Sequence, residues 1–268
     1  MMDIVSEFFQ VVLACVVKFF SDGISFSDMG ALVHKLALFL GIVLTSIFLA
    51  WTTYQSSTLW NKKVADIPAY RWLAGLSFAL TLLFAVSFFS LDYLHEVAIA
   101  RTKQWKQEIQ DNREWGNKTF SKTYYKLKQQ GEENFTNYPP PEAGGSVIPL
   151  NHESSGRITA KTYVGEAIAH FKASHPYLSL ILKTALAIPE EKIYQDNVRF
   201  FKENPGKNYG LNNAIRIAAE ELKAGFDLHI PPLIKATRSY LVIIFSFLMV
   251  AIYSAIGVIA YRDIKIYR

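Results

Sequence analysis

The chain has 268 residues, of which 51% are hydrophobic and 19% are charged. Globular proteins carry about 25% charged residues, so this composition is typical of a membrane protein. It excludes a disordered chain, which would lack the apolar surface needed to collapse or to insert. The single cysteine, Cys15, excludes an intrachain disulfide framework and a zinc site built on several cysteines. The formal net charge of +5 is mild for this length and indicates no class of partner, because membrane proteins often carry basic flanks.

Residues 1–26 hold an apolar stretch that the sequence leaves ambiguous. Residues 4–20 are short for a membrane span and are interrupted by charged residues such as Glu7 and Lys18. Asp3 and Glu7 stand where a cleavable secretory signal would carry basic residues. Apolar side chains at helical spacing share a broad face, so the pattern predicts either an interfacial helix lying on the bilayer or a short transmembrane helix. We expect Glu7 and Lys18 to lie near the lipid headgroups.

Three runs are long and apolar enough to predict transmembrane helices. The first two runs, residues 36–51 and 72–91, are predicted to form a membrane hairpin within residues 27–93. The third run, residues 240–261, begins the C-terminal segment 240–268. A bilayer core about 30 Å thick needs about 20 apolar residues, and a buried helix of a soluble protein rarely stays apolar on every face for this long. Basic and aromatic residues at the ends of the second and third runs are predicted membrane anchors; these are Arg71, Trp72, Tyr93, Tyr240, Tyr261 and Arg262.

The interiors of these runs indicate packing helices rather than a transport path. They carry no ionisable group near the middle, where a proton or ion route would expose one. Gly75 with Ala79, and Ala251 with Ala255, are small residues four apart, and we expect them to let helices approach closely.

The basic residues of the short segments predict the orientation. The linker between the first two spans carries Lys62, Lys63 and Arg71 against the single acid Asp66, and the C-terminal tail is also basic. The positive-inside rule places both in the cytoplasm, and long segments cross the membrane largely regardless of their own charge. We therefore expect an integral membrane protein, in a bacterial inner membrane, whose large segment 94–239 lies on the extracytoplasmic side.

Residues 94–239 are predicted to form a mainly helical extramembrane domain. The second span is expected to continue as a helix beyond the bilayer, because residues 94–115 contain neither proline nor glycine. A Pro/Gly-rich stretch at residues 131–156 predicts a loop. Further helices are predicted at residues 162–174, 176–188, 189–203 and 211–226, with Pro231 and Pro232 separating the last of them from the third span.

The fold predicted is thus an all-α integral membrane protein. It has three transmembrane helices, one N-terminal helix that is interfacial or a short transmembrane helix, and a mainly helical domain inserted between the second and third spans.

The sequence contains no complete catalytic or cofactor-binding motif. The GxSxG, GxxxxGK[ST] and GxGxxG patterns are missing. His95 and Glu96 resemble the start of a zinc-protease helix, but Ile99 stands where the second histidine is required. Asp92 with these two residues could form a site at the membrane surface, although an interfacial polar belt explains them as well. We therefore expect no catalytic residue and no cofactor.

A weak metal-site pattern lies further along the chain. Glu166 and His170 are one helical turn apart and could share a metal ion with His175. A fourth ligand is missing, so we favour a surface or capping role for these side chains and expect no metal. Basic and aromatic residues also alternate over residues 103–128, where we favour contact with anionic lipid or an acidic partner over nucleic acid.

These observations favour a non-enzymatic scaffold or assembly subunit of a multi-protein envelope complex, of the secretion or conjugation type or an exclusion or immunity factor. The alternative is a membrane-bound enzyme with a carboxylate/histidine site at the membrane surface. The expected partners are membrane lipid and other membrane or envelope proteins, including a second copy of the chain. We place the partner surface on the helices between Pro189 and Phe226, because an apolar stripe there must be covered; its residues are Tyr194, Val198, Phe200, Phe201, Leu211, Ile215, Arg216 and Leu222.

Overall fold

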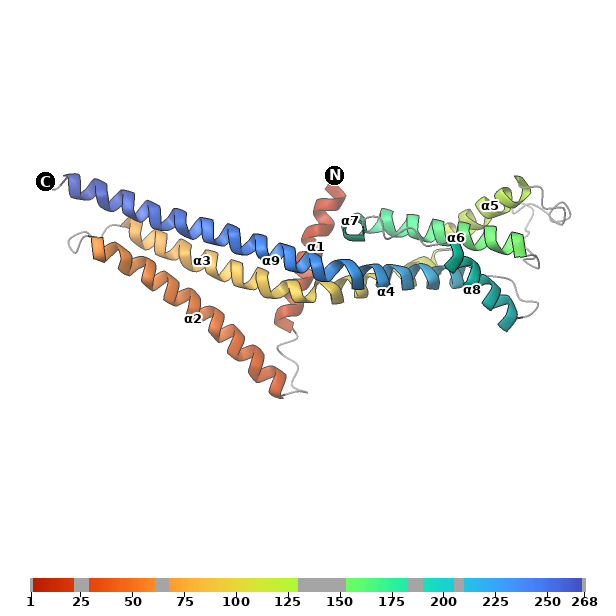
Figure 1. Ribbon diagram of the computed structural model, residues 1–268, viewed down its shortest axis with the longest axis horizontal. Helices are drawn as coiled ribbons and strands as arrows, with labels where there is room; N and C mark the ends of the chain where they lie inside the picture. Colours follow the sequence, from red (N-terminus) through yellow and green to blue (C-terminus); the bar gives the residue numbers. More distant parts are fainter. Residues whose placement is uncertain are drawn as a thin grey trace. The chain divides into compact units, whose positions relative to one another are not determined.

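The fold is almost entirely helical, and the residues that the structure describes include no strand. The structure is a computed structural model (Figure 1). It describes residues 2–21, 29–60, 68–129, 153–182, 190–204 and 210–266.

Four helical stretches within these residues are long and apolar enough to cross a membrane. They are Ile4–Ser21, Ala37–Ser56, Ala69–Asp111 and Leu211–Arg262. The last three cover the runs predicted as spans, apart from Leu36 at the start of the first run, so those apolar helices are confirmed. The first lies in helix α1 (Met2–Ser21), which qualifies by length and composition as well.

The chain divides into two compact units. One, the bundle unit, contains residues 2–11 and His95–Ile230. The other, the span unit, contains Val12–Leu94 and the C-terminal residues from Pro231 onward. Helix α1 therefore contributes its first half to one unit and its second half to the other.

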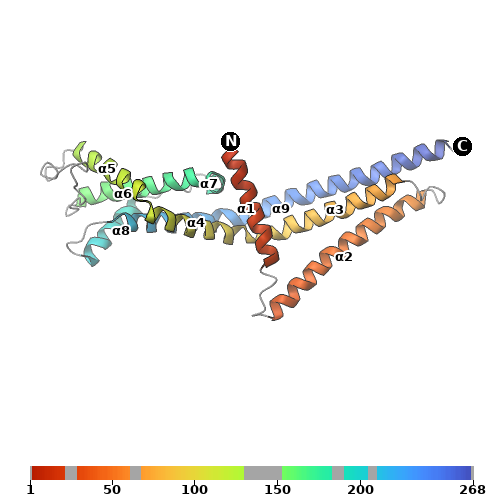
Figure 2. The same cartoon turned by 180° about the vertical axis from the view of Figure 1, so that it is seen from behind.

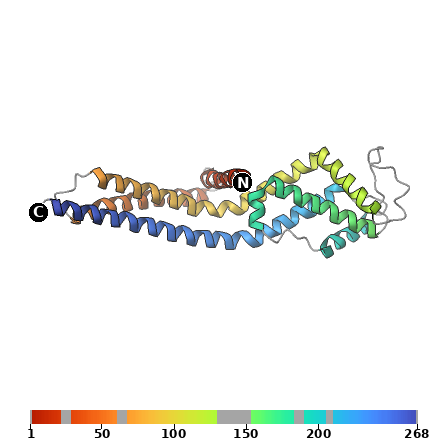
Figure 3. The same cartoon turned by 90° about the horizontal axis from the view of Figure 1, so that it is seen from above.

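The span unit is built on α2 (Met29–Trp60), α3 (Pro68–Ser90) and the second half of α9 (Leu211–Ile266). Figure 3 shows α3 and this half of α9 running side by side. Tyr70 of α3 packs there against residues of α9, and the buried cluster is completed by Met249, Ile252 and Ile256. Transmembrane helices associate through close packing and interhelical hydrogen bonds, and both are present in this unit.

The hydrogen bond between α2 and α3 joins two buried hydroxyl groups. Thr53 Oγ1 donates to Ser77 Oγ at 3.1 Å, and Ser77 Oγ in turn lies 3.9 Å from Met249 Sδ of α9. The prediction that Gly75 and Ala79 provide the close approach is wrong for α3: both residues are exposed, and a Cβ added at Gly75 would meet nothing within 4 Å. The packed face of α3 instead carries Ser77 and Thr81.

The bundle unit contains α4 (Leu94–Asp111), α5 (Arg113–Gln129), α6 (Glu153–Ser174), α7 (Pro176–Leu182), α8 (Glu190–Glu203) and the first half of α9. A short 3₁₀ turn, Leu91–Tyr93, joins α3 to α4, so the predicted continuation of the second span as helix is present. Helix α6 packs against α5, α7 and α8, as Figure 2 shows from behind. The core of the bundle unit includes the fully buried side chains of Trp105, Phe171 and Phe226.

Three features of the helices differ from those predicted. The helix expected through residues 94–115 is interrupted at Asn112, between α4 and α5, and two further boundaries differ. Helix α6 begins at Glu153, so the last four residues of the predicted loop 131–156 are helical; the rest of that loop, residues 131–152, lies outside the described residues. Helix α9 also does not end before Pro231 and Pro232 but runs through both. Each proline removes one hydrogen bond to the carbonyl four residues earlier. Burial of Phe226 and Ile230 on the preceding turns stabilises the helix up to that point.

Candidate functional site

The corner between α6 and α7 contains an enclosed ionisable pair. Helix α7 begins with Pro176, whose missing N–H is no loss at the first position of a helix. The next backbone N–H, that of Tyr177, donates to Oε2 of Glu7, which belongs to α1. The other carboxylate oxygen, Glu7 Oε1, lies 3.2 Å from Nδ1 of His175. Glu7 thus caps α7 from a point 170 residues earlier in the chain.

Both side chains of this pair are largely buried. The exposed fractions are 14% for His175 and 12% for Glu7. Burial lowers the pKa of His175 below its ordinary value, and the negative charge of Glu7 opposes this shift without reversing it. The ring is therefore neutral near pH 7, with its proton on Nδ1 and donated to Glu7. Nε2 of His175 is buried and makes no hydrogen bond to the described residues.

A polar cavity of about 310 Å³ opens beside the pair. It combines one cationic side chain, Arg101 of α4, with the Glu7 carboxylate and several hydroxyl and amide groups. The positive charge of Arg101 adds to the lowering of the His175 pKa. The cavity is lined by Ser6, Glu7, Gln10, Arg101, Ala173, Ser174, His175 and Pro176.

The three residues of the predicted weak metal pattern do not converge. Glu166 forms an ion pair with Lys122 of α5, and His170 Nδ1 accepts a hydrogen bond of 3.1 Å from Nε1 of Trp105. His175 faces Glu7, and burial lowers the pKa of His170 as well. Of the surface or capping role predicted for these side chains, the surface part is wrong for His175, which is enclosed. The capping part fits its position directly before α7, where its carbonyl accepts from the Ser179 N–H at 2.9 Å. Across the described ranges, no group of three or more histidine, cysteine, aspartate or glutamate side chains could hold a metal ion.

The predicted membrane-surface cluster is dispersed in the same way. His95 Nε2 lies 2.5 Å from Asp227 Oδ1, which joins α4 to α9 within the bundle unit. In the span unit, Asp92 pairs with Arg238 at 2.7 Å, and the Arg238 guanidinium lies 4.7 Å from the centre of the Phe88 ring. Both carboxylates therefore stabilise contacts between helices.

Helix α8 holds a buried carboxylate that the sequence did not single out. Asp196 is only 8% exposed and accepts hydrogen bonds from Arg199 at 2.6 Å and from Arg216 of α9 at 3.0 Å. A second ion pair, Lys192 with Glu221, also joins α8 to α9. Charge-assisted contacts of this kind fix α8 on α9, with Arg216 as a bridging residue.

The predicted partner surface needs a correction. Ile215 and Leu222 are 1% and 0% exposed, so they pack in the core of the bundle unit and are removed from that surface. Val198 is 44% exposed. The remaining apolar members whose side chains are described are half-buried, namely Tyr194, Phe200 and Leu211, and the side chain of Phe201 lies outside the described part.

The predicted membrane anchors have the exposure that their role requires, and the role itself stays a prediction. Trp72, Tyr240 and Tyr261 are 80%, 67% and 68% exposed. Arg71 and Arg262 are exposed too, whereas Tyr93 is half-buried with its ring 6.4 Å from that of Phe19.

Comparison with known proteins provides no relative: no protein family, no curated protein and no solved structure matches the chain.

Removing the Glu7 carboxylate should destabilise the bundle unit. Glu7→Ala leaves the Tyr177 N–H and the His175 ring without their acceptor, and we expect a loss of about 1.5–3 kcal/mol in the free energy of unfolding. Glu7→Gln keeps one acceptor and should lose about half as much. Thermal or urea unfolding measures both, followed by the intrinsic tryptophan fluorescence, to which the buried Trp105 contributes. Gln10→Ala, at an exposed position on the same cavity, is the control; an equal loss there would contradict the capping role.

The stability of the bundle unit should fall on acidification. The native pKa of His175 lies below the unfolded value of about 6.5. The unfolded state therefore binds more protons as the pH falls below about 6.5, and the stability is lost until the native ring also titrates. His170 acts in the same direction. Melting curves from pH 8 to 5 should show this decline, and it should be shallower in His175→Asn. A protein that becomes more stable over this range would contradict the buried neutral ring.

Proposed function

We propose that the chain is a non-enzymatic, membrane-anchored scaffold or assembly subunit of a multi-protein complex of the bacterial envelope, of the secretion or conjugation type or an exclusion or immunity factor. The observation that most supports this proposal is that polar side chains of the bundle unit pair with one another between helices. His95, Glu166 and Asp196, from three different helices, each pair with a residue of another helix. These groups stabilise a rigid unit of the kind that presents a surface.

The topology that we propose has three spans, and it follows from chain connectivity. Glu7 and Phe8 of α1 contact His175 and Tyr177, so residues 2–11 belong to the bundle unit. An extramembrane bundle unit needs an even number of membrane crossings between residue 11 and His95. The spans in α2 and α3 supply two, and a third crossing by α1 would put its first residues on the opposite side.

The length of α1 supports the same conclusion. With residues 2–11 held outside the bilayer, about ten residues of α1 remain, or roughly 15 Å of helix at 1.5 Å per residue. A span needs about 30 Å. Helix α1 is thus proposed as an interfacial helix on the extracytoplasmic side, and α9 provides the third span.

Cysteine labelling tests this topology. In a Cys15→Ser background, an impermeant thiol reagent added from outside should modify Val5→Cys and Lys126→Cys, which are exposed positions of α1 and α5. It should spare Lys62→Cys until the membrane is permeabilised. Labelling of Val5→Cys and Lys126→Cys from opposite sides would show that α1 spans the bilayer. A full reversal of the pattern would overturn the orientation and leave three spans.

The partner surface is proposed on the outer face of α8. Val198 and Tyr194 are four residues apart and so share a face, while Ile193 and Asp196 of the same helix are buried against the unit. A photocrosslinking amino acid at Val198 should trap a protein neighbour in native membranes. The same amino acid at Tyr125 of α5 is the matched control, because both side chains are 44% exposed. Adducts at Tyr125 but not at Val198 would show that the proposed placement of the partner surface on α8 is wrong.

The polar cavity favours one second candidate, a membrane-bound enzyme with a carboxylate/histidine site. Its carboxylate and histidine would be Glu7 and His175, beside the cationic Arg101. Arg101→Ala distinguishes the two proposals, because Arg101 lines the cavity without bonding to Glu7. Loss of biological function with unchanged complex formation and unchanged stability would favour the enzyme.

A further inference from the structure

An apolar groove lies within the span unit, between α2, α3 and α9. Its volume is about 380 Å³, which is in the range of ligand-binding clefts. Helices α2 and α3 are closest where α2 ends and α3 begins, and they diverge away from there (Figure 1). The groove lies between the diverging parts. Its lining residues are Leu38, Gly41, Ile42, Thr45, Leu49, Thr81, Phe84, Ala85, Phe89 and Phe245.

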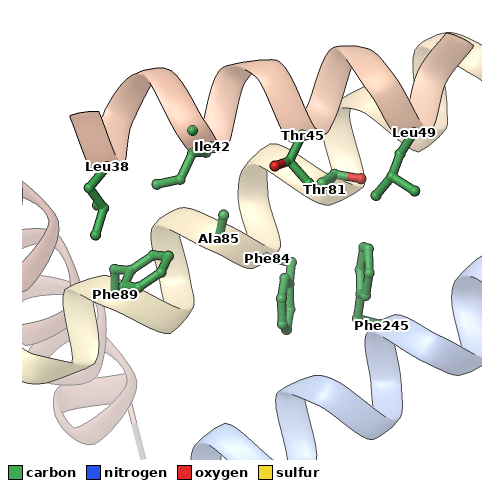
Figure 4. A pocket seen from close by; sticks show the side chains of 10 residues that line it. Leu38, Ile42, Thr45, Leu49, Thr81, Phe84, Ala85, Phe89 and Phe245 are labelled. Carbon is green, nitrogen blue, oxygen red and sulfur yellow. The ribbon is translucent and has the colours of Figure 1, made fainter. Parts of the chain in front are cut away.

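The groove has one well-defined aromatic wall. The rings of Phe84 and Phe245 stack with centroids 4.4 Å apart and an interplanar angle of 19°. Figure 4 shows Ile42 and Thr45 of α2 on the opposite side of the same space. Gly41 widens the groove on the α2 side, since a Cβ there would meet nothing within 4 Å.

All lining residues belong to the three apolar stretches Ala37–Ser56, Ala69–Asp111 and Leu211–Arg262. On the proposed topology these stretches are spans, so the medium outside the groove is hydrocarbon. An empty groove would forfeit the dispersion contacts of its lining atoms. The groove must therefore be filled by something available at bilayer depth.

The lining and the size of the groove decide between occupants. Water needs two to four polar partners, and eight of the ten lining residues offer none. The Thr81 hydroxyl already donates to the Ser77 carbonyl at 2.7 Å, so it can only accept from a water molecule. A helix of a second protein is a rigid cylinder roughly 10 Å wide, so it cannot follow a space that narrows as α2 and α3 converge. A flexible hydrocarbon chain has neither restriction.

We propose that the groove binds one acyl chain of a membrane phospholipid, held against the stacked rings of Phe84 and Phe245. This inference rests on the proposed membrane insertion of the span unit, but not on the partner surface.

Photolabelling with a defined lipid tests it. The protein is reconstituted in vesicles of phosphatidylglycerol and phosphatidylethanolamine that contain a phospholipid with a diazirine in its acyl chain, and labelled peptides are mapped by mass spectrometry. Labelling of Ile42, Thr45 and Phe84 should exceed, several-fold, that of Leu83, which is 64% exposed on α3 outside the lining. Purified protein should also retain one phospholipid per chain.

Two substitution pairs make the test specific. Gly41→Leu and Ala85→Leu fill the groove from opposite walls and should reduce its labelling to the Leu83 level, with loss of the retained lipid. Gly75→Leu and Ala79→Leu make the same changes at exposed positions outside the lining and should have no effect. Melting temperatures verify folding, and either filling variant alone is sufficient if the other fails to fold.

The outcomes separate the two proposals. Groove labelling equal to that of Leu83 and unchanged by both filling variants would overturn the acyl-chain site while leaving membrane insertion intact. Absence of label at Leu83 as well as in the groove would overturn membrane insertion, and with it the acyl-chain site.

Discussion

A carboxylate leaves water at an acceptable free energy only where hydrogen-bond donors replace the water that it loses, and Glu7 meets this condition at one place. The Tyr177 N–H and the His175 ring supply the donors, and both come from the corner between α6 and α7. The consequence reaches beyond local stability. The contact binds the first residues of α1 to the bundle unit. The chain must then cross the membrane an even number of times before it returns to the bundle unit at His95, and this sets the proposed number of spans. The charge of Glu7 would be costly in a helix that spans the bilayer. In a helix that lies on the membrane, the same charge provides a specific attachment point.

The long apolar helices could be predicted because length and composition suffice for them. Their packed faces could not. A helix that is apolar on all sides gives no periodic signal of orientation, so the small-residue pair Gly75 and Ala79 was as plausible as the polar pair Ser77 and Thr81. The structure buries the polar pair. A hydroxyl in an apolar helix can donate to a carbonyl of its own helix, as Thr53 does to Leu49 at 2.6 Å, whichever way it faces. One that faces another helix can also bond across the interface, as Thr53 does to Ser77 at 3.1 Å. Polar residues are thus a better guide than small ones to the packed face of α3.

Pro231 and Pro232 indicate a boundary between compact units, but not the end of a helix. The prolines stand where the bundle unit ends and the span unit resumes, and so they do indicate a boundary between compact units. They do not end the helix: α9 continues through both. Ile230, directly before them, is fully buried in the bundle unit, and Met249 beyond them is buried in the span unit. Packing on both sides maintains one helix across a locally weak point.

The candidate chemistry was the part least accessible from sequence, for a geometric reason. Helical spacing identifies neighbours on one helix, such as Glu166 and His170, but the residues that engage them lie far away in the chain: Lys122 is 44 residues from Glu166, Trp105 is 65 from His170, and Glu7 is 168 from His175. With such a partner, each side chain stabilises a contact between helices and is not free to act on a substrate. His175 differs in that its second ring nitrogen, Nε2, is buried without a hydrogen bond to the described residues. The Glu7 carboxylate beside the cavity already accepts from the Tyr177 N–H and from the His175 ring. A substrate that bound the Glu7 carboxylate from the cavity would compete with the donors that hold α1 to the bundle unit, which is why a structural role for Glu7 and His175 accounts better for the geometry.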